Sequence, residues 1–241
     1  RVDEAVDYVK RHKEITNILV SGGDAFMNSN AIIERYLREL TAIGHLDFIR
    51  FGSRVPVTLP ERIWGDQEFL DLFRHYGQKK ALYLVTQFNH PRELTDQAVR
   101  AVRAMIERGV QVRNQTVLLR GVNDSGEVLG ALLSGLTRVG VSPYYVFQCR
   151  PVTGVKDRFQ VPLLEGISIV DAAKAKQNGF GKSIRYAMSH PRGKIEIIGG
   201  LPGGETVFKF HQSKDDADIA RVFTRKLSPG DTWLDGELEG I

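Results

Sequence analysis

The feature that most constrains the fold is a regular alternation of short apolar runs with longer amphipathic stretches. Strand-length apolar runs are expected at residues 16–21, 47–51, 81–86, 110–119 and 143–148. Helices, with apolar residues three or four positions apart, are expected at residues 3–13, 30–43, 66–76, 93–108 and 125–139. Strands separated by helices of this length form parallel sheets through βαβ units, and continuously apolar strands are typical of sheets covered on both faces. The alternation predicts an α/β fold, either a full or partial barrel or a doubly wound sheet.

The pattern changes after residue 149, where a loop rich in Pro and Gly interrupts the alternation. A helix at 165–176, a strand at 183–188 and a hairpin-like segment, "KIEIIGG", are expected to follow. Beyond residue 200 the periodic signal weakens, and the acidic segment "DTWLDGELEG" is expected on the surface. We therefore divide the chain into an α/β part (1–150), a shorter part (151–200) and a peripheral tail (201–241).

Composition excludes several classes of function. The net charge is +4 and is spread along the chain, which argues against nucleic-acid binding but suits an anionic ligand. Cys149 is the single cysteine, so the chain has no disulfide framework and no CxxC or CxxxCxxC metal motif. A reducing, cytoplasmic location is expected, and no apolar run approaches the 18 residues that indicate a membrane span.

Polar residues cluster where the predicted strands end, which is where parallel α/β folds bind their ligands. The clusters are Ser21-Gly22-Gly23-Asp24, Arg50 to Arg54, Gln87 to His90, Asn114-Gln115 and Gln148-Cys149-Arg150. The two glycines would allow a ligand to approach the backbone closely, although the same letters also suit an ordinary turn with Asp24 near a helix start. Arg50 and Arg54 would share a face and clamp an anion if the strand continued, or would form surface ion pairs.

The remaining candidates have both a functional and an ordinary interpretation. Asn114 and Gln115 need partners if buried, so at least one is expected to face a ligand. His90 suits either a ligand contact or a loop cap, and Cys149 suits a small buried apolar position. Lys194, in "SHPRGKIEI", lies at a predicted loop–strand junction where a partly desolvated amine can form a Schiff base. Spacing alone favours a solvated loop lysine there.

Taken together, these motifs resemble the lysine 2,3-aminomutase family of radical S-adenosylmethionine enzymes. The resemblance rests on "SGGDAF", "RFGSRVPVTLPERI", "TQFNHPRELT", "VRNQTVLLRGVNDS", "PYYVFQCRPVTGVKDRFQVPLLEGI" and "SHPRGKIEI", which occur in the family's order. It implies a partial (β/α)6 barrel with a small C-terminal extension. It also implies three cofactors, S-adenosylmethionine, a [4Fe–4S] cluster and pyridoxal 5′-phosphate. In the family, a radical derived from S-adenosylmethionine starts the transfer of an amino group between the α and β carbons of an amino acid.

The resemblance assigns roles to individual residues. Gly22, Gly23 and Asp24 match the loop that contacts the methionine part of S-adenosylmethionine, and Asn114 and Gln115 match a segment beside it. Lys194 matches the lysine that carries pyridoxal phosphate. Arg54 is a candidate for the cofactor phosphate or the substrate carboxylate on grounds of charge, and His90 is a further cofactor-binding candidate.

Three departures from the family pattern change these expectations. The CxxxCxxC cluster motif is absent, and because the family carries it just ahead of the matching segment, with the initiator methionine also missing, we expect an N-terminally truncated chain. Gln87 replaces a histidine of the family motif. Arg150 and Ser189 occupy the positions of two aspartates that receive the substrate ammonium group in lysine-specific members. Loss of both negative charges argues against L-lysine and favours glutamate, or else a neutral amino acid.

The main alternative is a barrel protein that binds a ligand without a cluster and without mutase activity. A further alternative, an aminomutase that supplies a β-amino acid for modification of a translation factor, fits poorly with Arg150 because its substrate is lysine. For the enzyme, the resemblance implies a one-electron reductant such as flavodoxin or ferredoxin, and a homo-oligomer. No nucleic-acid or membrane partner is expected.

Overall fold

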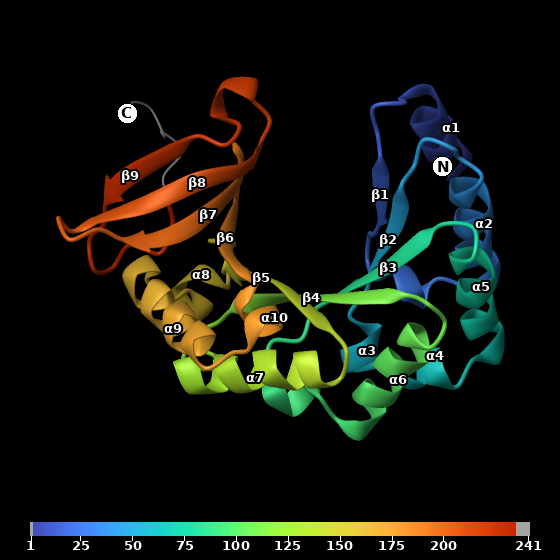
Figure 1. Ribbon diagram of the computed structural model, residues 1–241, viewed down its shortest axis with the longest axis horizontal. Coiled ribbons are helices and arrows are strands. Elements are labelled where there is room, and N and C mark those ends of the chain that lie inside the picture. Colours follow the sequence, from blue (N-terminus) through green and yellow to red (C-terminus); the bar gives the residue numbers. More distant parts are fainter. Residues whose placement is uncertain (1, 235–241) are drawn as a thin grey trace. The chain divides into compact units, whose positions relative to one another are not determined.

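The computed structural model describes residues 2–234, and within them the chain divides into two compact units (Figure 1). Among the described residues, unit 1 comprises residues 2–88, 92–114 and 138–142, and unit 2 comprises residues 89–91, 115–137 and 143–234. The strands are ordered β1 to β9 along the sheet, in the order of the chain. The domain boundaries that we expect at residues 150 and 200 remain a prediction.

Unit 1 is built from parallel βα repeats, as the alternation predicts. Its strands are β1 (Asn17–Val20), β2 (Phe48–Gly52), β3 (Ala81–Thr86) and the first part of β4 (Gln111–Leu118), all paired in parallel. Its helices are α1 (Val2–Arg11), α2 (Asn30–Thr41), α3 (Val55–Thr58), α4 (Glu61–Trp64), α5 (Gln67–Gly77) and α6 (Asp96–Ile106). Three of these helices begin at a side chain that accepts a hydrogen bond from a first-turn N–H group, which stabilises the helix start: Ser29, Asp66 and Thr95.

The core of unit 1 lies between one face of the sheet and the helices. A cluster of aromatic rings from the Phe26 turn, β2 and α5 has centroid separations between 4.9 and 6.0 Å. Burial alternates along β2 and β4, however, rather than covering both faces. Leu19, Arg50 and Tyr83 are register partners on the less buried face, and Leu19 is 44% exposed. The continuously apolar strand sequences predicted burial on both faces, whereas the structure buries these strands mainly on one face.

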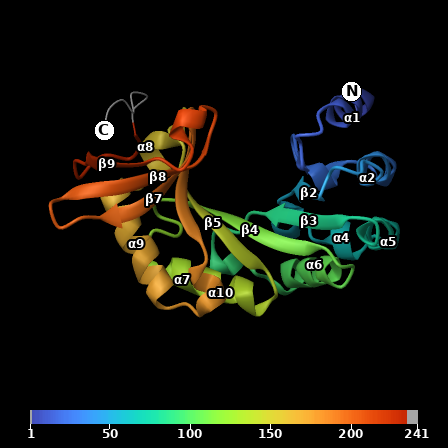
Figure 2. The same cartoon turned by 45° about the horizontal axis from the view of Figure 1, so that its top comes forward.

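Unit 2 joins a parallel strand pair to an antiparallel sheet. β5 (Ser142–Gln148) pairs in parallel with β6 (Arg185–His190), which pairs in antiparallel fashion with β7 (Gly193–Gly200). The antiparallel order continues through β8 (Glu205–Ser213), which lies beside β7, and β9 (Val222–Lys226), which lies beside β8 (Figure 1 and Figure 2). Its helices are α7 (Gly126–Arg138), α8 (Lys156–Phe159), α9 (Leu163–Ala175) and α10 (Gly179–Lys182).

Residues 205–226 contribute to the core of unit 2. Phe208, Phe210 and Phe223 are at most 2% exposed and pack with Tyr186, Ile195 and residues of α9. Sequence analysis did not foresee β8 and β9, and it places these residues in a peripheral tail. Of the acidic segment that is expected on the surface, residues 235–240 lie outside the described residues, whereas Leu234 is 5% exposed. Within residues 2–234, none of the helices is long and apolar enough to cross a membrane.

Candidate functional site

The Gly-Gly-Asp loop follows β1 in unit 1, and its glycines adopt a backbone conformation that other residues avoid. Gly22 has φ of +101° and Gly23 has φ of +59°, both in the left-handed region. A Cβ atom at either position would meet nothing within 4 Å, so backbone conformation rather than crowding requires glycine here. Both residues are exposed, which leaves the backbone accessible to a ligand.

Asp24 ties this loop to the next strand end. Its Oδ1 accepts a hydrogen bond from the Phe26 N–H at 3.0 Å, and its Oδ2 accepts one from the Arg54 N–H at 2.6 Å. The side chain is half-buried. A carboxylate has about four acceptor positions, so these two bonds leave capacity for a ligand. Sequence analysis missed the bond to Arg54 because the two residues are distant along the chain.

Arg54 and Arg50 do not form the anion clamp that a continuing strand would have produced. β2 ends at Gly52, and Arg54 precedes α3. The Arg50 guanidinium donates to Asn17 Oδ1 at 2.6 Å. Arg54 donates to Glu93 Oε1 at 2.8 Å and remains 44% exposed, so only Arg54 keeps a guanidinium that solvent reaches freely.

Asn114 and Gln115 have different surroundings, because neighbouring strand residues point to opposite faces. Asn114 is 1% exposed, and its amide accepts from the Phe88 N–H at 2.7 Å and donates to the Phe88 carbonyl at 3.1 Å. This pair of bonds fixes the segment that follows β3. Gln115 is half-buried, and it is the member of the pair better placed to contact a ligand.

Two further asparagines, Asn89 and Asn123, bind backbone groups of unit 2. The sequence did not lead us to expect this role. Asn89 Oδ1 accepts from the Val117 N–H at 2.9 Å, and the half-buried His90 follows it. Asn123 is fully buried, donates to the Asn89 carbonyl at 2.7 Å and accepts from the Leu119 N–H at 2.7 Å. Buried side-chain amides need such partners. The asparagines of "NHP" and "GVND" could therefore have been expected to bind backbone groups if they were buried.

Lys194 is the second residue of β7 in unit 2 and lies over aromatic rings of β5. Its Nζ is 4.3 Å from the centroid of the Tyr145 ring and 5.5 Å from that of Phe147. The ammonium of a lysine is attracted to the face of an aromatic ring at such distances. Lys194 is half-buried and pairs across the hairpin with Ser189. It is therefore not the solvated loop lysine that spacing alone favoured.

Small residues of β6 make room for this arrangement. Ala187 is the register partner of Phe147, and Ser189 is the register partner of Lys194. Neither side chain is long enough to separate the lysine from the rings. The two predicted site residues Ser189 and Lys194 are thus brought together, whereas Arg150, two residues beyond the end of β5, is exposed.

Three titratable groups of unit 2, His211, Tyr145 and Cys149, favour their neutral forms. Burial lowers the pKa of His211, and the charges of Arg185 and Lys194 lower it further. The His211 ring centroid is 5.9 Å from that of Tyr145. Burial is the main cause that raises the pKa of Tyr145, and a hydrogen bond with Tyr144 raises it further. Burial also raises the pKa of the Cys149 thiol, which is 3% exposed and hence stays protonated near neutral pH.

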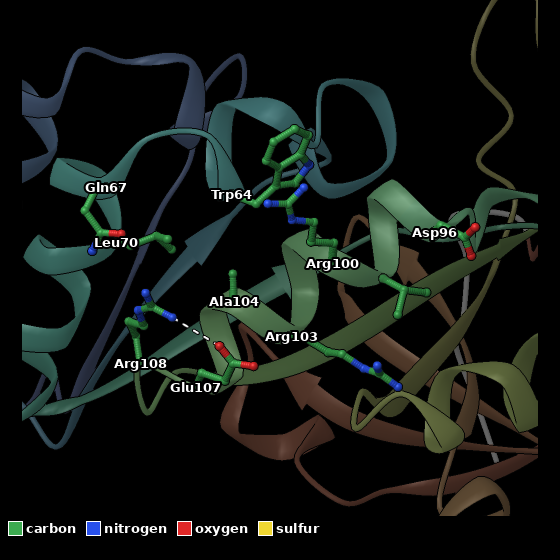
Figure 3. A pocket seen from close by; sticks show the side chains of 10 residues that line it. Trp64, Gln67, Leu70, Asp96, Arg100, Arg103, Ala104, Glu107 and Arg108 are labelled. Carbon is green, nitrogen blue, oxygen red and sulfur yellow. Dashed lines mark hydrogen bonds and ion pairs between the residues drawn. The ribbon is translucent and has the colours of Figure 1, made fainter.

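A groove elsewhere in unit 1 contains none of the predicted site residues. It has a volume of about 520 Å³ and lies among α4, α5 and α6. Figure 3 shows that the Arg100 and Arg103 side chains point in different directions. The Arg100 guanidinium lies 3.9 Å from the Trp64 ring centroid, and Arg108 pairs with Glu107. The cationic groups do not converge on a common point.

Comparison with known proteins identifies relatives of the chain. No protein-family model matches it. A putative L-lysine 2,3-aminomutase of Aquifex aeolicus is 38% identical over 240 residues, which are 99% of this chain and 64% of the relative. The L-lysine 2,3-aminomutase of Clostridium subterminale is 37% identical over 180 residues, 75% of this chain and 42% of the relative. This chain is homologous to the 2,3-aminomutases. The resemblance found in its motifs is thereby confirmed.

The relatives include enzymes named for different substrates. The glutamate 2,3-aminomutase of Clostridioides difficile is 34% identical over 192 residues, 80% of this chain and 44% of the relative. The chain thus spans between 42% and 64% of the length of these three 2,3-aminomutases. Identity does not separate a lysine from a glutamate substrate, so that question rests on individual residues.

A solved structure shows the same fold at low identity. A radical SAM methyltransferase from Sphaerobacter thermophilus has a TM-score of 0.53 to this chain, with 20% identity over 77% of this chain and 56% of that one. This likeness shows the fold alone. It confirms the predicted α/β fold class of the radical SAM type.

Proposed function

We propose that this protein is a radical SAM, pyridoxal phosphate-dependent 2,3-aminomutase whose substrate is an amino acid other than lysine, with glutamate as the leading candidate. The observation that carries the proposal is the position of Lys194. Its amine lies over Tyr145 and Phe147 and opposite Ser189, in a chain homologous to 2,3-aminomutases. This is a half-buried lysine with an aromatic wall on one side and a small, uncharged neighbour on the other.

These residues fit pyridoxal phosphate. The cofactor binds covalently to a lysine amine, and when bound it provides an electron sink for chemistry at an amino acid's nitrogen and neighbouring carbons. Lys194 supplies the amine, and Tyr145 and Phe147 supply aromatic surface suited to a planar ring. Since neither Ala187 nor Ser189 fills the space beside the lysine, the amine can turn from the rings toward a bound group.

The loop after β1 fits the amino-acid part of S-adenosylmethionine, which in this family is the source of the hydrogen-abstracting group. Gly22 and Gly23 expose backbone without side chains, and the remaining acceptor capacity of Asp24 suits an ammonium. Gln115 is the amide that contacts the cofactor in this proposal. Asn114 acts by holding the Phe88 backbone, and Arg54 and His90 are further candidates for binding anionic or polar parts of the ligands.

The residues of this chain do not fit a [4Fe–4S] cluster. Such a cluster is held by cysteine thiolates, and the chain has one cysteine, Cys149, which is buried. Among the residues that the structure describes, no group of three or more His, Cys, Asp or Glu side chains is arranged to hold a metal ion. We therefore derive no step through the cluster from these residues.

Charge supports a substrate other than lysine. Arg150 and Ser189 occupy positions where lysine-specific aminomutases carry aspartates. In residues 2–234, Arg150 is exposed and its guanidinium has no ion-pair partner, so it is available to a carboxylate. A lysine side chain would meet a positive charge there and would lose two charge-assisted hydrogen bonds. A glutamate side chain would gain one.

The alternative of a ligand-binding barrel without mutase activity is less well supported, because relatives of this chain are named as aminomutases.

The proposed enzyme also needs a one-electron reductant, for which flavodoxin or ferredoxin is suitable, and we propose that it acts as a homo-oligomer.

The decisive experiment is anaerobic reconstitution of the protein, expressed from its complete reading frame, with iron, sulfide and pyridoxal phosphate. The reconstituted protein is then incubated with S-adenosylmethionine, a reductant and single amino acids, and β-amino products are separated by chromatography. β-Glutamate formed from glutamate, with no β-lysine from lysine, supports the proposal. Turnover of lysine with none of glutamate contradicts the substrate assignment, and the absence of any β-amino product contradicts the aminomutase assignment.

A further inference from the structure

An ion triad of one buried carboxylate and two partly exposed arginines lies beside the turn that precedes Lys194. Asp218 is 4% exposed, and its two oxygens accept from two different arginines. Oδ2 accepts from the Arg192 guanidinium at 2.6 Å, and Oδ1 accepts from Arg221 Nε at 2.8 Å. Both guanidinium groups also lie over Phe210, at 5.8 and 5.1 Å from its ring centroid. The carboxylate and the ring therefore hold the two arginines from different directions.

Arg192 is fixed through its backbone as well as its side chain. It lies two residues before Lys194, in the turn between β6 and β7. Its N–H donates to His190 Nδ1 at 3.3 Å, and its carbonyl accepts from Ser213 Oγ at 3.2 Å. The turn is thus bound to β6 on one side, and to β8 and the segment after it on the other.

Gly193 joins Arg192 to Lys194 and leaves no room for movement toward β8. A Cβ atom at this position would lie 2.1 Å from the Gln212 carbonyl oxygen. The pairing of β7 with β8 also shifts register between Lys194 and Ile195. Such irregularities change the direction in which a strand side chain points. The direction of the Lys194 side chain consequently depends on how the turn is seated.

We propose that Asp218 is a positioning residue for Lys194. Through Arg192 it holds the turn in the one arrangement that directs the lysine amine over Tyr145 and Phe147. This inference rests on the proposed function of Lys194 in binding pyridoxal phosphate. It assigns to η3 (Asp216–Asp218), 24 residues beyond the lysine, a role in the geometry of the cofactor site.

The charge arrangement explains why the carboxylate matters. Without it, Arg192 and Arg221 would lose the carboxylate that accepts from both of them, and repulsion between their like charges would favour movement of Arg192 away from Phe210. An ion pair around a buried carboxylate adds little net stability over an apolar replacement, but removing one partner alone leaves the other charges uncompensated and destabilises the protein. Removing the charge of Asp218 is therefore expected to affect both the placement of Lys194 and the stability of the fold, and thermal unfolding measures the second effect separately.

The test compares the unmodified protein with Asp218→Asn and with a matched control, Glu165→Gln. Glu165 forms a two-bond pair with Arg120, each bond 2.6 Å long, in the same unit but outside the β6–β7 turn. Pyridoxal phosphate is titrated into each protein and followed by absorbance. The bound cofactor is then fixed with borohydride and located by peptide mass. Thermal unfolding and hydrogen exchange of residues 190–195 are measured in parallel.

We expect Asp218→Asn to weaken cofactor binding about tenfold, as partners outside the first coordination sphere do at metal sites, and to speed exchange in residues 190–195. Glu165→Gln should leave both unchanged. Arg192→Gln should have the same effect as Asp218→Asn, and the double variant no larger effect, because both act through one contact. Asp218→Glu, which keeps the charge, should recover part of the affinity.

The outcomes separate this inference from the proposed function. If the unmodified protein fixes no cofactor at Lys194, the proposed function is wrong and the inference falls with it. If the unmodified protein fixes cofactor and Asp218→Asn binds it equally well, the positioning role is wrong while the function stands. An equal loss in Glu165→Gln would also overturn it, since that result would indicate a general loss of stability.

Discussion

Ser189 and Lys194 are direct partners across the β6–β7 hairpin, so the residue that would decide substrate charge lies opposite the residue that would bind the cofactor. A side chain at position 189 therefore lies next to the amine that would react. An aspartate there would place a negative charge beside any amino acid bound at Lys194, whereas serine places none.

The first prediction reverses the proposed substrate charge preference. Arg150→Asp combined with Ser189→Asp should shift binding from glutamate toward lysine, by on the order of a hundredfold in the ratio of the two affinities, because each charged hydrogen bond contributes about 1.5–3 kcal/mol. Binding is measured as the absorbance change of the cofactor-loaded protein when each amino acid is added. Arg158→Asp, a charge change at an exposed residue of α8, is the control. An unchanged ratio would remove these two positions from substrate recognition.

A second prediction concerns the amine itself. Lys194→Ala should abolish borohydride-fixed pyridoxal phosphate, because it removes the amine that lies over the rings of Tyr145 and Phe147. Lys209→Ala removes an exposed lysine of the neighbouring strand β8 and should fix as much cofactor as the unmodified protein. Cofactor that stays attached to the Lys194→Ala protein would show that the assignment of Lys194 is wrong.

A third prediction separates the two neighbouring amides of β4. Asn114→Ala should lower the free energy of unfolding by about 2–4 kcal/mol, since it removes two buried hydrogen bonds, one to the N–H and one to the carbonyl of Phe88. Gln115→Ala should change stability by less than about 0.5 kcal/mol, as is usual outside buried networks, and should weaken binding of S-adenosylmethionine instead. Urea unfolding and calorimetric titration measure the two effects. Equal stability losses would contradict the different roles given to the pair.

The framework of elements was largely predictable, because it depends on patterns within short stretches of chain. Helix α2 follows from the spacing of Ile32, Ile33, Tyr36, Leu37 and Leu40, of which Ile33, Leu37 and Leu40 are buried whereas Ile32 is 42% exposed. β8 was missed although Thr206, Phe208 and Phe210 alternate with exposed or half-buried residues, a pattern that does predict a strand.

The site was predictable in its residue types but not in its contacts. The letters around Asp24 and Asn114 indicate polar strand ends, yet the partners Arg54 and Phe88 are decided by how strands pair in space. Lys194 shows the same limit. Nothing adjacent to it in sequence indicates that Tyr145, on a strand two positions away in the sheet, would lie beneath its amine.

A fourth prediction tests why Gly193 precedes the lysine. Gly193→Ala should lower the free energy of unfolding by about 1–3 kcal/mol, the usual cost of forcing extra atoms into a packed site, because the new Cβ would lie 2.1 Å from the Gln212 carbonyl oxygen. Gly199→Ala is a close control. Gly199 has φ of +151°, similar to +153° at Gly193, but a Cβ there meets nothing within 4 Å. Equal losses in urea unfolding would attribute the effect to backbone conformation rather than to the carbonyl contact.

The last prediction concerns acid sensitivity and His211. Burial lowers the pKa of this histidine below its ordinary value of 6.5, and Arg185, Lys194 and Lys209 act in the same direction while Glu196 opposes them. The folded protein thus binds fewer protons at this position than the unfolded chain does. Its contribution to stability is present above the unfolded pKa and decreases as pH falls from about 6.5 toward the folded pKa.

His211→Gln should therefore lose less stability than the unmodified protein when pH is lowered from about 7.5 to about 5.5, the interval that contains the ordinary histidine pKa. Guanidinium unfolding at the two pH values measures the difference. His75→Gln, at an exposed histidine of α5, should behave like the unmodified protein. If His211→Gln is as acid-sensitive as the control, another group is responsible for the pH dependence, and the burial of His211 beside Tyr145 has no titration consequence.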